Sequence, residues 1–114
     1  MNVRFTLPFS TSREVGKTYL NSQGLVLGVI LNKTENSTKI SAFGDCAIKC
    51  DFDTNENYMV PVWYDFNSNE FKHFTPEDLN QKIVGYIKPC QKDSAGNIIS
   101  DYDMSLREFI FLGF

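Results

Sequence analysis

The sequence predicts an all-β protein, a small sandwich or barrel of about seven short strands with one short helical turn and an extended N-terminal arm. Short apolar segments recur along the chain between turn-forming residues, which is typical of an antiparallel sheet. Aromatic residues, which favour strands, make up 14% of the 114 residues. Four prolines and seven glycines divide the chain into short pieces. We expect one domain, with residues 1–12 as an arm or edge strand and residues 13–114 as a single β domain.

The N-terminal segment carries an apolar residue at every second position, namely Val3, Phe5, Leu7 and Phe9. Because Pro8 cannot donate a ladder hydrogen bond, it restricts this segment to the edge of a sheet or to the surface. The segment is therefore either an edge strand of the chain's own sheet or an arm that contacts another molecule.

Residues 10–22 are polar, and we expect an irregular segment there. Residues 24–31 form a continuous apolar run with β-branched members. The run is too short for a typical helix and predicts a buried strand. Gly28 inside it indicates a bulge or the close approach of another backbone.

Two strand-like segments follow a polar loop. Residues 39–43 predict a short strand, and Gly44 with Asp45 predicts a bend after it. Polar and apolar residues then alternate over residues 45–53, which predicts a strand with one face on the core and one in water. The residues that face the core in this pattern are Cys46, Ile48, Cys50 and Phe52.

Residues 58–74 predict a β-hairpin. The first strand, residues 58–66, has large apolar side chains at both odd and even positions and so needs cover on two faces. Residues 67–69 are turn formers, and residues 70–74 predict the return strand. The residues that we expect in the core are Ile48, Phe52, Val60, Val62, Trp63, Tyr64, Phe71 and Ile83.

The C-terminal third begins with residues 75–78, where Thr75 can cap a helical turn and Pro76 suits its first position. Residues 83–87 predict a strand. Residues 106–114 have apolar side chains on both faces and predict a last strand that either closes the sheet or meets a neighbour. The candidates for partner contacts, which can extend a neighbouring sheet edge or fill its pockets, are Val3, Phe5, Leu7, Phe9, Phe109, Phe111 and Phe114.

Composition argues against several classes of protein. The net charge is −3 and no basic stripe occurs, so we expect no nucleic-acid partner. No run of about 18 apolar residues occurs, and the first residues lack the apolar core of a signal peptide, so we expect neither a membrane span nor a leader. Three cysteines without framework spacing fit a reducing compartment.

A metal site would have to be built from Cys46, Cys50, His73 and Cys90. On one strand Cys46 and Cys50 lie roughly 13 Å apart, which is too far to bind one ion or to form a disulfide. Both sit among apolar residues, and we expect them to act as small buried hydrophobes. We therefore expect no metal and no cofactor.

The sequence also lacks the complete motif of a calcium loop or of a catalytic site. Residues 51–57 place oxygens at alternate positions, as a calcium loop does, but Glu56 stands where that loop needs glycine and Val62 where it needs glutamate. His73 is the only histidine, and no nucleophile motif or glycine-rich phosphate loop accompanies it. We expect no catalytic residue, and hence no enzyme.

The order of motifs between residues 44 and 87 resembles that of the small β-rich capsid-decoration and head-fibre-base proteins of tailed bacteriophages. In those proteins a valine-rich strand leads to a V-x-Y-D strand, a short x-F-x return strand and an I-G strand. The matching positions in this chain are Val60, Val62, Tyr64, Asp65, Phe71, Val84 and Gly85. By the same resemblance, residues 109–112 correspond to the closing strand and residues 24–31 to an early strand.

The resemblance implies a non-enzymatic virion structural protein that decorates the capsid or forms part of a head fibre. It would be made in the host cytoplasm and would contact capsid or other virion proteins, and it would also associate with itself. The apolar residues on both faces of several strands independently favour a partner or a homo-oligomer. The alternative is a small soluble β-rich binding module, such as a tail-associated adhesin or an inhibitor of a host protein.

Overall fold

The structure is a computed structural model that describes residues 1–50, 58–89, 94–95 and 106–114. It confirms the prediction of an all-β fold. The described residues contain eight strands and one 3₁₀ turn: β1 (Val3–Leu7), β2 (Thr18–Leu20), β3 (Val26–Lys33), β4 (Thr38–Lys49), β5 (Val60–Asp65), β6 (Glu70–His73), η1 (Pro76–Asp78), β7 (Ile83–Ile87) and β8 (Leu106–Phe111). Within these residues, no helix is long and apolar enough to cross a bilayer.

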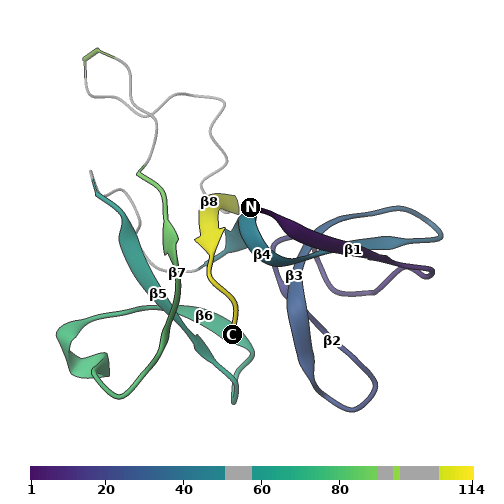
Figure 1. The fold of residues 1–114 in the computed structure, drawn as a ribbon, viewed down its shortest axis with the longest axis horizontal. Coiled ribbons are helices and arrows are strands. Elements are labelled where there is room, and N and C mark those ends of the chain that lie inside the picture. The colour runs from purple at the N-terminus through teal and green to yellow at the C-terminus, as the bar shows by residue number, and fades with distance from the viewer. Residues whose placement is uncertain (51–57, 90–93, 96–105) are drawn as a thin grey trace.

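The strands form one curled antiparallel sheet in the order β2-β3-β4-β8-β7-β5-β6, and β1 pairs in addition with β4. The sheet curls into a half-barrel. Figure 1 shows β1, β2 and β3 on one side, β5, β6 and β7 on the other, and β4 and β8 between them. The 12-residue strand β4 serves both sides, because its residues 38–43 pair with β1 and its residues 44–49 pair with β8.

The main core lies on the inner face of this half-barrel. Five residues that the sequence analysis placed in the core are buried there, namely Ile48, Val60, Val62, Tyr64 and Phe71. They pack with five further residues, Val29, Val84, Ile87, Phe109 and Phe111. Phe52, also expected in the core, lies outside the described residues.

Trp63 and Ile83 are only partly buried, in contrast to the expectation that both belong to the core. Adjacent strand residues point to opposite faces, so Trp63 lies on the outer face of β5 when Val62 and Tyr64 face inward. Ile83 is the cross-strand partner of Trp63 and shares that outer face. The indole Nε1 of Trp63 is nevertheless buried, and it has no hydrogen-bond partner among the described residues.

A second, smaller core consists of Tyr19, Ile30 and Ile40, with Leu7 and Val15 packed against it. It lies on the opposite face of β3 from the main core, because Val29 belongs to one core and the adjacent Ile30 to the other. This explains why residues 24–31 form an uninterrupted apolar run.

The segment between β1 and β2 is fastened to β4 through one threonine. The backbone N–H of Thr11 donates to Thr38 Oγ1 at 2.9 Å, and that hydroxyl donates to the carbonyl oxygen of Phe9, also at 2.9 Å. Thr38 is fully buried, so this pair of hydrogen bonds fixes the path of the segment.

Gly28 confirms the expected close approach of another backbone. A Cβ at this position would collide with the carbonyl oxygen of Ser41 and with the side chain of Ile40. The pairing of β2 with β3 also shifts register beside Gly28, between Tyr19 and Leu20. Glycine is therefore required here by the packing of β3 on β4.

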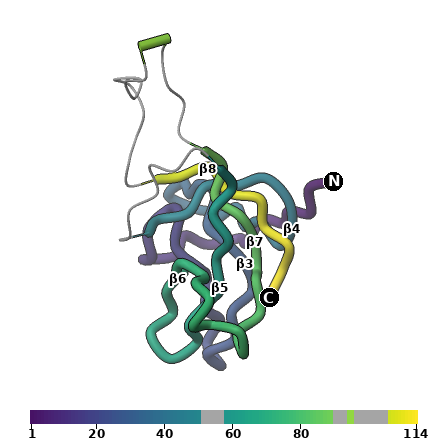
Figure 2. Tube along the Cα trace, turned by 90° about the vertical axis from the view of Figure 1, so that its left-hand side faces the viewer, coloured from purple at the N-terminus to yellow at the C-terminus, as the bar shows by residue number. Residues whose placement is uncertain are grey.

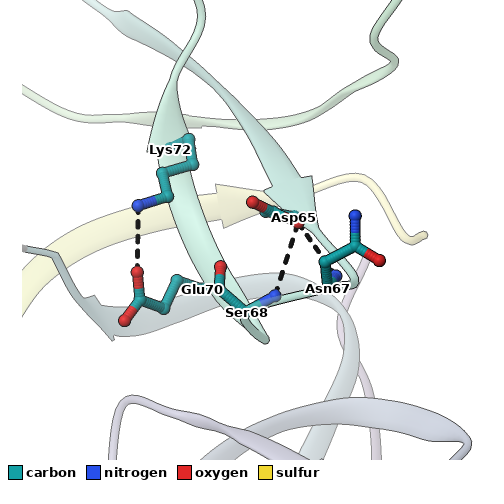
Figure 3. Close-up of polar contacts among 5 residues, drawn as sticks. All are labelled: Asp65, Asn67, Ser68, Glu70 and Lys72. Atoms are coloured by element: carbon teal, nitrogen blue, oxygen red, sulfur yellow. Dashed lines mark hydrogen bonds and ion pairs between the residues drawn. The ribbon is translucent and has the colours of Figure 1, made fainter.

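The predicted hairpin is formed by β5 and β6, and Figure 3 shows the polar contacts of its turn. Asp65 Oδ1 accepts hydrogen bonds from the backbone N–H groups of Asn67 at 2.8 Å and Ser68 at 3.4 Å. Lys72 and Glu70 form an ion pair of 2.9 Å along β6. The following helical turn, η1, is a single 3₁₀ turn in which the Thr75 backbone N–H donates to the Asp78 carboxylate at 2.9 Å.

Candidate protein-interaction surfaces

Strand β1 forms an edge of the sheet. It pairs with β4 from Val3 to Leu7, while β3 occupies the other side of the same part of β4. The N-terminal segment is therefore an edge strand of the chain's own sheet. Within the residues that the structure describes, no strand pairs with the outer side of β1. An edge of this kind presents unpaired backbone N–H and C=O groups to a partner.

Apolar side chains stay exposed along this edge. Val3 is 43% exposed, Phe5 37% and Phe9 47%. Leu7, the fourth residue expected to make partner contacts, packs instead against the second core. The ring of Phe9 packs beside the ring of Tyr19, with 6.2 Å between the ring centroids. This contact holds Phe9 in place, although its side chain remains accessible.

The β1 edge is held in place without a partner. Arg4 Nη2 donates to the carbonyl oxygen of Asp45 at 3.1 Å, and Asn2 Oδ1 accepts from the backbone N–H of Asp45 at 2.9 Å. Figure 2 shows the N-terminal end projecting from the side of the molecule away from β6. A strand that is already ordered loses little conformational entropy when a partner binds.

The C-terminal segment does not provide the expected partner surface. Phe109 and Phe111 are fully buried in the main core, because β8 lies between β4 and β7 and both side chains point inward. Phe114 is partly buried, with its ring 4.8 Å from the rings of Tyr64 and Phe111. This segment therefore completes the chain's own sheet, which was the other possibility that the sequence left open.

A cleft of about 380 Å³ lies where β2 and β6, the two ends of the curled sheet, approach each other. Its lining residues are Glu14, Lys17, Thr18, Lys49, Cys50, Asn69, Glu70 and Phe71. Beside it, Thr18 Oγ1 and Tyr64 Oη share a hydrogen bond of 2.7 Å that connects β2 to β5. The sequence contains no signal for this contact, because the two residues are 46 positions apart and both segments appear ordinary.

The charges of the cleft balance one another. Its lining contains two glutamates and two lysines, and Glu14 forms an ion pair with Lys49. The hydrogen bond and the charge of Lys49 lower the pKa of Glu14, so that carboxylate stays ionised at neutral pH. Glu70 is paired in turn with Lys72. The cleft therefore offers no net charge that would select an anion or a cation.

Two of the three cysteines that the sequence analysis considered as metal ligands, Cys46 and Cys50, lie on β4 and just after it. Cys46 and Cys50 pack against the main core. Burial raises the pKa of Cys46 to about 12, so its thiol is protonated and a poor nucleophile near neutral pH. Across the described ranges, no three His, Cys, Asp or Glu side chains gather as metal ligands would.

The remaining sites considered from sequence fall in two places. His73 is the cross-strand partner of Val62 at the end of β6, and it is partly buried. Cys90 and residues 51–57, the calcium-like loop, lie outside the described residues. The β1 edge is thus the part of the described surface where exposed apolar side chains and unpaired backbone groups coincide.

Comparisons of the chain with protein families, with curated proteins and with solved structures find no match.

Proposed function

We propose that the protein is a non-enzymatic structural protein of a phage virion, which assembles on the capsid or in a head fibre through the β1 edge. The observation that carries the proposal is the exposure of the apolar side chains of Val3 and Phe5 on a strand with one unpaired side, with Phe9 exposed just beyond its end.

This combination suits assembly by strand addition. An extended partner segment would take the unpaired backbone groups of β1 as hydrogen-bond partners, which supplies affinity independent of sequence. The exposed side chains of Val3 and Phe5 would then select for an apolar neighbour. An exposed edge strand with apolar side chains is otherwise a site of unwanted aggregation. A dedicated partner removes that hazard.

The virion setting is supported by the resemblance of residues 44–87 to phage decoration and head-fibre-base proteins. Four of the residues that carry the resemblance, Val60, Val62, Tyr64 and Phe71, build the inner face of the β5–β6 hairpin. They belong to the main core, whereas β1 pairs with β4. The resemblance therefore bears on the fold and its setting, and the β1 edge bears on the mode of attachment.

The test is whether the protein is part of the particle and whether β1 attaches it. Antibodies raised against the protein should label purified virions in electron micrographs. Phe5→Lys should reduce incorporation into particles at least tenfold, since it places a charge in the contact. Leu27→Lys is the matched control, because Leu27 on β3 has nearly the same exposure, 38% against 37%, and the same change in charge. Virions without the protein would overturn the proposal, as would equal incorporation of both variants.

The cleft between β2 and β6 favours one alternative, a small soluble β-rich binding module such as an adhesin or an inhibitor of a host protein. Its volume lies within the range of about 300–1,000 Å³ that is usual for ligand sites. A protein that stays monomeric at all concentrations and is absent from virions would favour this alternative. Lys17→Glu would then weaken ligand binding, whereas the virion protein would tolerate the same change.

A further inference from the structure

We propose that the partner of β1 is a second copy of this chain, paired antiparallel about a two-fold axis that passes beside Phe5. This inference rests on the proposed function in one respect, namely that the β1 edge is a contact surface. It adds the identity of the partner and the register of the pairing.

The residues of β1 are self-complementary in this register. With Phe5 opposite Phe5 of the second copy, Val3 stands opposite Leu7 and Arg4 opposite Thr6. Residues directly opposite in an antiparallel pair point to the same face of the sheet. The apolar side chains of both copies therefore meet on one face, and the polar side chains meet on the other.

This register places no two charged side chains directly opposite each other. Arg4 is the only charged side chain on β1, and its cross-strand neighbour would be the neutral Thr6. The guanidinium of Arg4 is also directed to its own subunit, where it donates to the carbonyl oxygen of Asp45. No like charges would therefore stand directly opposite each other, which is the arrangement that destabilises cross-strand pairs.

The other exposed edges are less suited to pairing with a copy of themselves. Within the described sheet, β2 and β6 also have a single neighbouring strand, but they are three and four residues long against five for β1. The charged side chains of β6, Glu70 and Lys72, are already paired with each other. Pro8 ends the β1 ladder cleanly, because it has no N–H to offer beyond Leu7.

Pairing of the two strands would join the two sheets into one across the axis. The contact is small. A standard stable interface buries roughly 1,600 Å² and involves about 20–30 residues on each side, whereas this one involves five residues of β1 on each side. We therefore expect a dimer that depends on concentration in solution. On a particle surface, where copies are held close together, the effective concentration would favour it.

The experiment is disulfide trapping with Phe5→Cys. Residues directly opposite in an antiparallel pair have Cα atoms about 4.5–5.5 Å apart, which is within the range that a disulfide can bridge. Under mild oxidation, this variant should form a covalent dimer on a non-reducing gel at least ten times faster than the unmodified protein. The unmodified protein controls for the native cysteines.

Phe9→Cys is the matched control. Phe9 is more exposed than Phe5, 47% against 37%, but it lies beyond the end of β1. If the strand geometry is extended to residue 9, the two copies of Phe9 lie roughly 26 Å apart, which prevents a disulfide. A mixture of Val3→Cys with Leu7→Cys should cross-link, whereas Val3→Cys alone should not. Circular dichroism shows whether each variant keeps its strand content.

The outcomes separate this inference from the proposed function. If Phe5→Cys cross-links no faster than Phe9→Cys while Phe5→Lys still loses incorporation into virions, the second copy is excluded and the β1 edge binds another virion protein. If Phe5→Cys cross-links selectively but virions contain no trace of the protein, the dimer stands and the virion function is wrong. Equal trapping of all the variants would exclude a defined register.

Discussion

The hydrogen bond between Thr18 and Tyr64 should couple the two sides of the half-barrel energetically. The two hydroxyl oxygens are 2.7 Å apart, both residues are buried, and β2 and β5 are not neighbours in the sheet. A typical intramolecular hydrogen bond contributes about 0.5–1.5 kcal/mol net to the free energy of unfolding. This contact is therefore large enough to measure with single substitutions.

The two single variants should differ in cost. Tyr64→Phe leaves the buried Thr18 hydroxyl without this partner and should lower the free energy of unfolding by about 1–3 kcal/mol. Thr18→Val should cost less, because Tyr64 Oη keeps a second contact with Asn69 Oδ1 at 3.4 Å. The double variant replaces both polar groups with apolar ones, so it should lose less than the sum of the two, with a coupling of about 1 kcal/mol.

Urea unfolding followed by the fluorescence of Trp63, the only tryptophan, gives the three free energies. The double-mutant cycle separates the interaction energy of the Thr18–Tyr64 pair from the other effects of removing each hydroxyl. If the two single losses add to within about 0.3–0.5 kcal/mol, the residues are energetically independent. That result would refute the reasoning that this hydrogen bond ties β2 to β5.

The same pair predicts a dependence on pH. Burial raises the pKa of Tyr64, so the folded state favours the neutral phenol. Its contribution to stability is full below the pKa of an unfolded tyrosine, about 10, and is lost as pH rises through the higher folded value. The stability of the unmodified protein should therefore fall relative to Tyr64→Phe as the pH rises above about 10. A difference that stays constant over this range would contradict the raised pKa.

Two further predictions concern packing and thiol reactivity. Phe109→Ala should lower the free energy of unfolding by about 3–5 kcal/mol, because the Phe109 ring is fully buried. Trp63→Ala should cost less than half as much, since Trp63 lies on the outer face; equal losses in urea unfolding would contradict the assigned faces. The thiol of Cys46 should react slowly with iodoacetamide near pH 8 (roughly the pKa of a free thiol), because its pKa is raised to about 12, and quickly once urea unfolds the chain. Rapid labelling of Cys46 in the native protein, detected by peptide mass spectrometry, would contradict this.

Local patterns in the sequence were sufficient for most strands. The alternation over residues 3–9, the apolar run at residues 24–31 and the hairpin of residues 58–74 all correspond to strands in the structure. Each of these three segments contains its own periodicity and its own turn residues, and these two signals do not depend on distant parts of the chain.

The exceptions are places where distant pairing decides the outcome. Gly44 predicted a bend between two strands, but β4 continues through it, with Gly44 at φ +100° opposite Phe111. Strand β2 was expected to be irregular, and it has only three residues that pair with β3. Neither feature can be read from a local window, because the partner strand supplies the hydrogen bonds.

The candidate contact residues show the same limit. Phe5 and Phe109 both lie in apolar strand-forming segments near the ends of this sequence, and the sequence pattern does not separate a buried strand from an exposed one here. In the structure Phe109 is buried, because β8 has a neighbour on each side, and Phe5 remains accessible on an edge. Burial thus depends on strand order, which the sequence pattern does not encode.

The position of β4 has a consequence for how the protein folds during synthesis. Val3 pairs with Phe43 and Phe111 pairs with the very next residue, Gly44, so the earliest and the latest strands meet on one element. While the ribosome is still adding residues 50–105, the second part of β4 has to wait for β8. Contacts between such distant segments slow folding and leave apolar strands open to aggregation in the meantime. We therefore expect the nascent chain to close its sheet only after translation has passed β8.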